Sequence, residues 1–308
     1  MTISPRVFLA VVLLSVAALA QSNPQSESEK VAEIRKAAER GEADAQFRLG
    51  FAYANGRGLP QDDAEAAKWY RRAAEQGEAD APVYLGMLYG EGKGVRQDYA
   101  EAIKWFRRGA ELQIARPGAR ASFLRVLSAR QLGFLYENVQ GVLQDYAEAA
   151  KWYRIAADQG DAGAQTNLGM LYAEGKGVPQ DYAEAIKWLR RAADQGDAYA
   201  RNNLAALYYQ GQGVPKDFVE ATKWARKAAE QGNGLAQAKL GLAYHEGKGV
   251  PQDYVQADMW MNLAAAASTG EKQKELAEFR DAIAAKMTPE QIAEAQRLAR
   301  EWKPSQAK

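Results

Sequence analysis

The sequence predicts an all-α fold: a superhelical solenoid of six tandem 36-residue helix-turn-helix repeats with N- and C-terminal capping helices. A tryptophan recurs every 36 residues, with one longer interval of 47 residues. These residues are Trp69, Trp105, Trp152, Trp188, Trp224 and Trp260. A tyrosine stands sixteen residues before each of them, at Tyr53, Tyr89, Tyr136, Tyr172, Tyr208 and Tyr244. Because two markers keep the same register, the chain is interpreted as an array of repeats.

The unit Asp161–Gly196 shows why the first half of a repeat is expected to be a helix. Ala164, Leu168 and Leu171 are separated by four and three residues, which places them on one helical face. Gly175 follows at the expected end of this helix, where a glycine can adopt the left-handed conformation that closes a helix C-terminus. A second helix must then follow through a tight turn.

The second half of the same unit carries its own helix signals. Asp181 is expected to cap the helix N-terminus, with Glu184 reaching back to complete a capping box. Trp188 and Leu189 then face inward. The Asp/Glu pair recurs at Asp62/Glu65, Asp98/Glu101, Asp145/Glu148 and Asp217/Glu220, with Asp253/Gln256 as a neutral form. Such short helices are marginal alone, so stacking between repeats must stabilise them.

The first twenty residues are typical of a signal peptide. Val7–Ala20 is apolar except for Ser15 and ends in Ala18-Leu19-Ala20, the small-x-small pattern of a cleavage site. A membrane anchor is the alternative, but this stretch covers only about 21 Å as a helix against a hydrocarbon core of about 30 Å. We therefore expect cleavage after Ala20 and no transmembrane segment in the mature chain, followed by a disordered leader over residues 21–30.

The two ends of the array are expected to be capped. Residues 31–41 resemble the latter half of a second helix and are interpreted as an N-terminal cap. The six repeats span residues 42–270, residues 271–303 form C-terminal capping helices, and residues 304–308 form a tail. The last helix has Thr288 as its N-cap and Gln291 at the reciprocal position.

The third repeat is irregular because about residues 114–127 are inserted. Pro117 and Gly118 prevent the preceding helix from continuing unchanged, so the extra segment is expected to bulge from or offset the superhelix. A binding edge and drift under weak constraint both remain open as explanations of this insertion.

Composition excludes several classes of function. The chain has 40 basic and 39 acidic residues, so its net charge of +1 gives no broad field for binding nucleic acid. It has no cysteine, which excludes disulfides and thiolate metal sites. His245 is the single histidine, and its neighbour Glu246 points elsewhere on a helix. We therefore predict no catalytic residue, no metal site and no cofactor.

The run GKGVPQDYAEAIKWLRRAADQG, at residues 175–196, resembles the Sel-1-like repeat family, a branch of the tetratricopeptide-like solenoids. The resemblance extends over residues 42–270. It implies a right-handed superhelix of antiparallel helix pairs that acts as an adaptor, often in the bacterial envelope, and it implies no shared active site. Cysteine-rich members have been associated with penicillin-type compounds, but their cysteines have no counterpart in this chain.

Variable polar positions on the first helices are the candidate partner-binding groove, since in related solenoids these helices line the concave face. The candidates are Arg48, Tyr84, Gln131, Asn167, Arg201, Asn203 and Lys239. Gln46, Gln165 and Gln237 stand at the start of the same helices. Rows of amides and cations suit an extended peptide or a glycan. That these side chains are only solvent-facing is the open alternative.

The sequence therefore predicts a non-enzymatic protein-interaction scaffold or regulatory adaptor, exported to the periplasm or secreted. Its expected partners are proteins, such as a membrane sensor or an envelope complex. A cell-wall glycan-binding module is one alternative. A hydrolase of β-lactams or peptidoglycan is another, but it needs a nucleophile with a nearby base, and no serine in the repeats has such a base in register.

Overall fold

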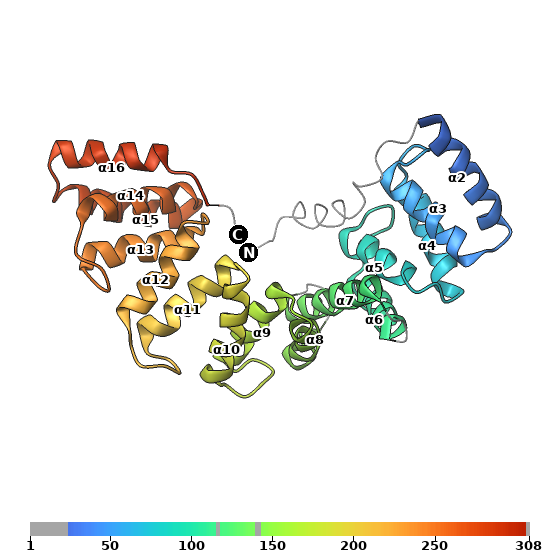
Figure 1. Cartoon of the computed structure of the whole chain (residues 1–308), viewed down its shortest axis with the longest axis horizontal. Coiled ribbons are helices and arrows are strands. Elements are labelled where there is room, and N and C mark those ends of the chain that lie inside the picture. The colour runs from blue at the N-terminus through green and yellow to red at the C-terminus, as the bar shows by residue number, and fades with distance from the viewer. Residues whose placement is uncertain (1–23, 115–117, 139–142, 306–308) are drawn as a thin grey trace. The chain divides into compact units, whose positions relative to one another are not determined.

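The computed structural model describes residues 24–114, 118–138 and 143–305 (Figure 1). Within these ranges the regular structure consists of fifteen α-helices, α2 to α16, without a β-strand. The all-α solenoid predicted from the sequence is confirmed. The predicted signal peptide, residues 1–20, lies outside the described residues.

Each repeat is a pair of helices. The first helices are α3 (Ala43–Asn55), α5 (Ala81–Glu91), α7 (Ala119–Asn138), α9 (Ala162–Glu174), α11 (Ala198–Gln210) and α13 (Gly234–Glu246). The second helices are α4 (Asp63–Glu75), α6 (Tyr99–Ile114), α8 (Tyr146–Asp158), α10 (Tyr182–Asp194), α12 (Phe218–Ala229) and α14 (Tyr254–Ala266). The caps are α2 (Pro24–Glu39), α15 (Gly270–Ala284) and α16 (Pro289–Glu301).

The chain divides into two compact units, Met1–Ser128 and Ala129–Lys308, and the boundary falls inside α7. We call them the N-terminal unit and the C-terminal unit and describe each by itself. In both, a first helix packs against the second helix of its own repeat and against the second helix of the repeat before it.

The two helices of a repeat approach closely because a glycine faces the second helix. A Cβ atom at Gly169 would lie 2.8 Å from Leu189 and 3.1 Å from the carbonyl oxygen of Ala185. Gly50 stands in the same relation to Tyr70. The LG pair of the repeat therefore places a buried leucine next to a position that takes only a very small residue, which is Ala205 in the fifth repeat and glycine in the others.

The aspartate caps form as predicted, but the reciprocal half of the capping box does not. Asp181 accepts hydrogen bonds from the backbone N–H groups of Ala183 and Glu184 at 2.9 and 3.0 Å. Its own N–H donates to the carbonyl of Tyr172 at 2.9 Å, so Glu184 has no free donor to reach. Glu184 instead pairs with Lys187 at 2.8 Å. Among the described residues, a complete capping box is present only in the last helix, where Thr288 and Gln291 form it.

The recurring tyrosine also ties adjacent repeats together. An arginine of a second helix donates to the hydroxyl of the tyrosine eighteen residues later, as Arg35 does to Tyr53 at 2.8 Å and Arg226 does to Tyr244 at 2.6 Å. Both guanidinium groups also lie over the tyrosine rings. The same bond joins Arg71 to Tyr89, Arg154 to Tyr172 and Arg190 to Tyr208.

The second glycine of each GxG turn makes another contact between repeats. Gly58 has φ +68°, and a Cβ atom there would lie 2.8 Å from the carbonyl oxygen of Glu27, at the start of the preceding α2. Gly94 meets Asp63 and Gly213 meets Tyr182 in the same way. These glycines therefore do more than end a helix, because any side chain would push neighbouring repeats apart.

The repeated tryptophans belong to the core. Trp69, Trp188, Trp224 and Trp260 are buried. Trp105 and Trp152 are half-buried, and Trp105 packs against the apolar cluster of the second repeat. None of the six lines the groove described below. The repeated tryptophans therefore fill space between the helices and do not form the groove surface.

The N-terminal cap is longer than predicted. Helix α2 begins at Pro24, so residues 24–30 are helical and the expectation of a disordered leader over them is wrong. Its first turn is held because Gly58 lies against Glu27 and Val31. Residues 21–23 lie outside the described part of the chain.

Two helices close the C-terminal unit, as predicted. Leu276 and Ile283 of α15 join the apolar cluster of α14, and Ala295 of α16 joins the cluster around Trp260. Trp302 packs edge to face on Trp260, with ring centroids 6.2 Å apart. The final residues then return to the array, where the backbone N–H and hydroxyl of Ser305 both donate to the carbonyl of Glu230.

The insertion in the third repeat is largely helical. Helix α7 has 20 residues, against 13 in α9, because it starts at Ala119 within the inserted segment. Leu124 and Ala121 are buried, and Arg120 forms an ion pair with Asp80 at 2.7 Å. Pro117 lies outside the described residues. The extra residues therefore lengthen a first helix and add a cation to the N-terminal unit.

Candidate functional site

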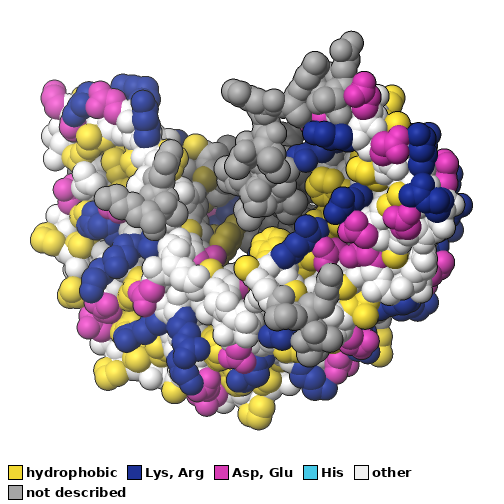
Figure 2. Space-filling model, turned by 45° about the vertical axis from the view of Figure 1, so that its right-hand side comes forward, with side chains coloured by type: hydrophobic (Ala, Val, Ile, Leu, Met, Phe, Trp, Pro, Cys, Tyr) yellow, Lys and Arg dark blue, Asp and Glu magenta, His cyan; other side chains and the backbone are white. Residues whose placement is uncertain are grey.

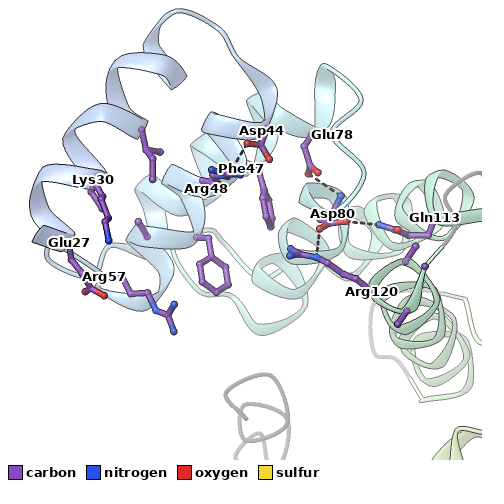
Figure 3. Close-up of a pocket in the computed structure, with 17 residues that line it drawn as sticks. Glu27, Lys30, Asp44, Phe47, Arg48, Arg57, Glu78, Asp80, Gln113 and Arg120 are labelled. Atoms are coloured by element: carbon purple, nitrogen blue, oxygen red, sulfur yellow. Dashed lines mark hydrogen bonds and ion pairs between the residues drawn. The ribbon is translucent and has the colours of Figure 1, made fainter. Parts of the chain in front are cut away.

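The N-terminal unit contains a groove with a volume of about 960 Å³ (Figure 3). It is lined by residues from α2, from α3, from the segment before α5 and from the start of α7. Its charged lining residues are Glu27, Lys30, Asp44, Arg48, Arg57, Glu78, Asp80 and Arg120. Four are cations and four are carboxylates, so recognition here depends on their arrangement and not on net charge.

Aromatic side chains form one wall of this groove. The Phe47 ring contacts Tyr84 edge to face at 5.4 Å and lies 5.7 Å from Tyr70. Phe51 contacts the same Tyr84 ring at 6.0 Å. Phe47 and Tyr70 are buried, whereas Phe51 and Tyr84 are half-buried. Burial raises the pKa of the Tyr84 hydroxyl, which therefore remains a protonated hydrogen-bond donor at neutral pH.

A buried carboxylate organises the end of the groove near α7. Asp80 has only 8% of its side chain exposed and pairs with Arg120 at 2.7 Å, while Gln113 donates to it at 3.0 Å (Figure 3). Glu78 accepts from the backbone N–H groups that begin α5. Arg120 also lies over the Phe47 ring at 5.7 Å. This cation is therefore held against an aromatic wall, with 64% of its side chain exposed.

The end near α2 carries the cations Lys30, Arg48 and Arg57, of which only Arg48 has a carboxylate partner among the described residues. Arg48 is paired with Asp44, one turn earlier on α3, at 2.9 Å. Within the described part of the chain, neither Lys30 nor Arg57 forms an ion pair. Arg57 lies over the Phe51 ring at 5.5 Å. Figure 3 shows Lys30 projecting from α2 and Arg57 from the turn that follows α3.

Of the seven predicted groove residues, one lines this groove and a second contacts residues that line it. Arg48 lines it, and Tyr84 supports its aromatic wall from α5. The other five, Gln131, Asn167, Arg201, Asn203 and Lys239, belong to the C-terminal unit. Gln131 is half-buried, as is Asn203, which accepts a long bond of 3.5 Å from Asn202.

Three of those five side chains are used within the fold. Asn167 lies beside the hydroxyl of the buried Tyr153, which donates to Glu137 at 2.7 Å. The Nε atom of Arg201 donates to the carbonyl of Ala193 at 3.0 Å. Gln46, Gln165 and Gln237 stand at the same repeat position as Arg201, are buried and bond the corresponding carbonyls. This position therefore fastens a first helix to the preceding repeat, and we leave it out of the binding surface.

Lys239 is also engaged inside the C-terminal unit. Its ammonium donates to the side-chain and backbone oxygens of Asn202 at 2.8 and 3.1 Å, which joins α13 to α11. Burial lowers the pKa of this ammonium to about 8, because a charge in a poorly hydrated site is disfavoured.

The sequence reasoning missed Phe47, Phe51, Arg57 and Arg120. A signal was present, because the position of Phe47 is valine, arginine, threonine, asparagine or alanine in the other five repeats. An aromatic pair one turn apart on a single first helix marks a departure from the repeat. Arg120 could not be placed because it lies in the insertion, which has no counterpart to align with.

The described residues contain no group of three or more histidine, aspartate or glutamate side chains that could hold a metal ion. His245 lies between the rings of Tyr254 and Phe279, at 5.6 and 5.4 Å. In the ranges that the structure covers, no helix has the length and apolar character needed to cross a membrane. Figure 2 shows basic and acidic side chains interspersed over the visible face.

The helix pairs, the contacts that recur at each junction and the groove together define a helical-repeat solenoid protein. A family model described as the Sel1 repeat matches six segments: 43–78, 79–113, 126–161, 162–197, 198–233 and 234–268. The chain belongs to the Sel1 repeat family.

A solved structure agrees with this assignment. The chain is similar to a Sel1 repeat protein from Oxalobacter formigenes, with 32% identity, a TM-score of 0.59, and coverage of 77% of this chain and 100% of that one. A protective antigen with an SLR fold from uropathogenic Escherichia coli is 29% identical, with a TM-score of 0.41, over 90% of this chain and 72% of that one. A search of the curated proteins found no match.

Proposed function

We propose that this chain is a protein-interaction scaffold whose groove in the N-terminal unit holds a segment of a partner protein. Sel1 repeat proteins generally serve as such scaffolds. The observation that carries the proposal is the half-buried Phe51 and Tyr84 wall with Arg57 and Arg120 beside it. Aromatic and arginine side chains are the residues most enriched among those that dominate protein–protein binding.

The groove suits a polypeptide better than a sugar. Arg120 and Arg57 lie over Phe47 and Phe51, at 5.7 and 5.5 Å, and so occupy aromatic faces on which a sugar ring would stack. The Arg120 side chain is 64% exposed beyond its pair with Asp80, and Arg57 is half-buried, so both guanidinium groups can still donate to carboxylates or backbone carbonyls of a partner. A cell-wall glycan is the second candidate ligand, and a β-lactam or peptidoglycan substrate is the third.

The proposed location is the periplasm or the exterior of the cell, reached through a signal peptide cut after Ala20. The apolar stretch Val7–Ala20 supports this proposal. A membrane sensor or an envelope complex is the kind of partner that such a location would offer. Amino-terminal sequencing of the exported protein should begin at Gln21, and finding Met1 instead would contradict it.

A peptide array and a glycan array probed with the same protein test the function. Wild type should bind a subset of peptides, and Arg120→Ala combined with Phe51→Ala should lose at least ten-fold in affinity for them, since each removes a side chain of the wall. Lys68→Ala, on the outer face of α4, is the matched control and should bind like wild type. Binding to glycans alone, or equal peptide binding by all three proteins, would contradict the proposal.

A further inference from the structure

Helix α2 makes the junction contacts of a second helix, but in the described part of the chain it has no first helix of its own. Arg35 bonds Tyr53, and Gln46 bonds the carbonyl of Ala38 at 3.2 Å, as their counterparts do in later repeats. Gly58 lies against its N-terminal turn in the way that Gly94 meets Asp63. A first helix would be expected on the remaining face.

The next repeat shows what covers that face. Three residues hold α3 in place: Ala66 and Tyr70 of α4, and Tyr84 of α5. A Cβ atom at Gly50 would lie 2.8 Å from Tyr70 and 3.2 Å from the Ala66 carbonyl oxygen, and Tyr84 contacts Phe47 and Phe51 of α3. Ala66 and Tyr70 are 0% and 1% exposed because α3 covers them.

Shifting those three residues back by one repeat gives Lys30, Ile34 and Arg48. All three line the groove (Figure 3 labels Lys30 and Arg48). Lys30 is exposed, Ile34 is half-buried, and the Arg48 side chain is 62% exposed. We call this surface the first-helix slot, defined by Lys30, Ile34 and Arg48. A helix bound in this slot would lie against α2 and α3 in the same way that α3 lies against α4 and α5.

This inference rests on the proposed function: we propose that the first-helix slot binds an amphipathic helix of a partner protein. The partner helix would pack against α2 as α3 packs against α4. Helix-in-groove binding uses an apolar stripe at spacings of three and four residues. Here Ile34 and the neighbouring Phe51 and Ala52 would receive that stripe. A helix bound in the slot would lengthen the array by one helix, and the junctions between the existing repeats would keep their geometry.

The charges of the slot specify an acidic helix. Positions that are alanine and tyrosine in the next repeat are Lys30 and Arg48 here, and Arg57 lies beside them without an ion pair in the described part of the chain. A partner carboxylate would pair with Lys30 or Arg57, whereas Arg48 already pairs with Asp44 at 2.9 Å. Residues 7–19 of this chain stand 36 residues before α3 but contain no acidic side chain. They therefore match the slot less well than an acidic helix from another protein.

A charge-swap experiment tests the assignment. The probe is a helix-stapled, fluorescein-labelled peptide of residues 161–175, a first helix of this chain, with Ala173→Glu one turn beyond the glycine that faces the second helix. Anisotropy should show binding to the full chain and to the chain starting at Gln21. It should be about three- to five-fold tighter than for the Ala173→Lys peptide, the range of an exposed ion pair.

The matched variants lie on α2 itself. Lys30→Glu should reverse the order of the two peptides. Lys36→Glu changes a residue paired with Glu33 outside the groove and should leave that order unchanged. A fused helix provides a test that does not depend on peptide affinity: in the full chain, residues 6–22 are replaced by a copy of residues 161–177. The fusion should slow amide hydrogen exchange of α2 by at least about ten-fold and abolish probe binding.

Four outcomes would overturn the assignment. Unchanged exchange of α2 in the fusion would show that no first helix fits there. Binding only to the chain starting at Gln21 would make the leader the occupant, and a dimer that the fusion abolishes would make it a second copy. Binding that the fusion and Lys30→Glu leave intact, but Arg120→Ala removes, would refute the slot and leave the proposed groove function standing.

Discussion

The two ends of this array are finished differently. At the C-terminal end, α15 and α16 cover α14, and Ile283 and Ala295 are both 0% exposed. At the N-terminal end, α2 covers α3 but exposes the face that carries Lys30 and Ile34. A repeat array needs its ends covered to stay soluble, and polar substitutions can serve that purpose as well as extra helices. The N-terminal end therefore combines solubility with an accessible face.

The largest expected effect is at the closed end. Trp260→Ala should lower the free energy of unfolding of the C-terminal unit by about 3–5 kcal/mol, because it leaves a cavity between α14 and α16. Urea denaturation followed by circular dichroism measures this change. A loss below about 1 kcal/mol would mean that the α16 cap does not depend on this indole.

A matched pair of isoleucines compares the two ends directly. Ile283→Ala removes a fully buried side chain and should cost about 2–5 kcal/mol. Ile34→Ala removes a half-buried side chain and should cost less than about 1 kcal/mol, because fewer contacts are lost. Equal costs in urea titrations would show that the α2 face is already covered in the protein alone.

The junction bonds should be equal at both ends. Tyr53→Phe removes the hydroxyl that binds Arg35, and Tyr244→Phe removes the one that binds Arg226. Each should cost about 0.5–1.5 kcal/mol, the usual net value of one hydrogen bond. Amide hydrogen exchange of α2 and α12 reports the two sites separately. A cost confined to Tyr244 would argue that α2 does not dock as a second helix.

The remaining prediction concerns pH. The folded Lys239 has a pKa of about 8, against about 10.4 in an unfolded chain. Between these values the unfolded chain binds more protons, so this lysine destabilises fully below pH 8 and progressively less as the pH rises toward 10. The stability of wild type relative to Lys239→Met should therefore increase from pH 7.5 to pH 9.5, as measured by urea titration. A constant difference would refute the lowered pKa.

The fold could be predicted from the sequence because recurring residues show where each repeat begins and ends. The tryptophans, glycines and capping aspartates each mark a fixed structural position, and the structure confirms the helix pairs and both caps. The predicted hydrogen bond from Glu184 back to the Asp181 N–H does not form. That N–H donates instead to the Tyr172 carbonyl, nine residues earlier across the turn, which a local motif does not show. The start of α2 was misjudged because its stabilising neighbour, Gly58, lies beyond it in the sequence.

The candidate groove was harder to predict for a physical reason. Polar residues on a first helix can face a partner or can bond the preceding repeat, and both uses favour the same amide and cationic side chains. Gln165 and Lys239 make such internal bonds, whereas Arg48 does not bond the preceding repeat. Gln165 stands at a repeat position that meets a carbonyl of the preceding second helix, whereas Lys239 and Arg48 share one repeat position. Lys239 is used internally because the preceding first helix offers it the oxygens of Asn202, and that neighbour is not evident from the position of the lysine within its own repeat.

The tyrosine–arginine bonds join residues eighteen positions apart, and the glycine contacts of the turns join residues 31 positions apart, so both spans are shorter than one repeat. A block of 36 residues could therefore be excised or duplicated, and the flanking helices would meet through the same pairs of atoms as before. Gene duplication can thus change how many repeats the protein displays, without a new interface having to evolve each time.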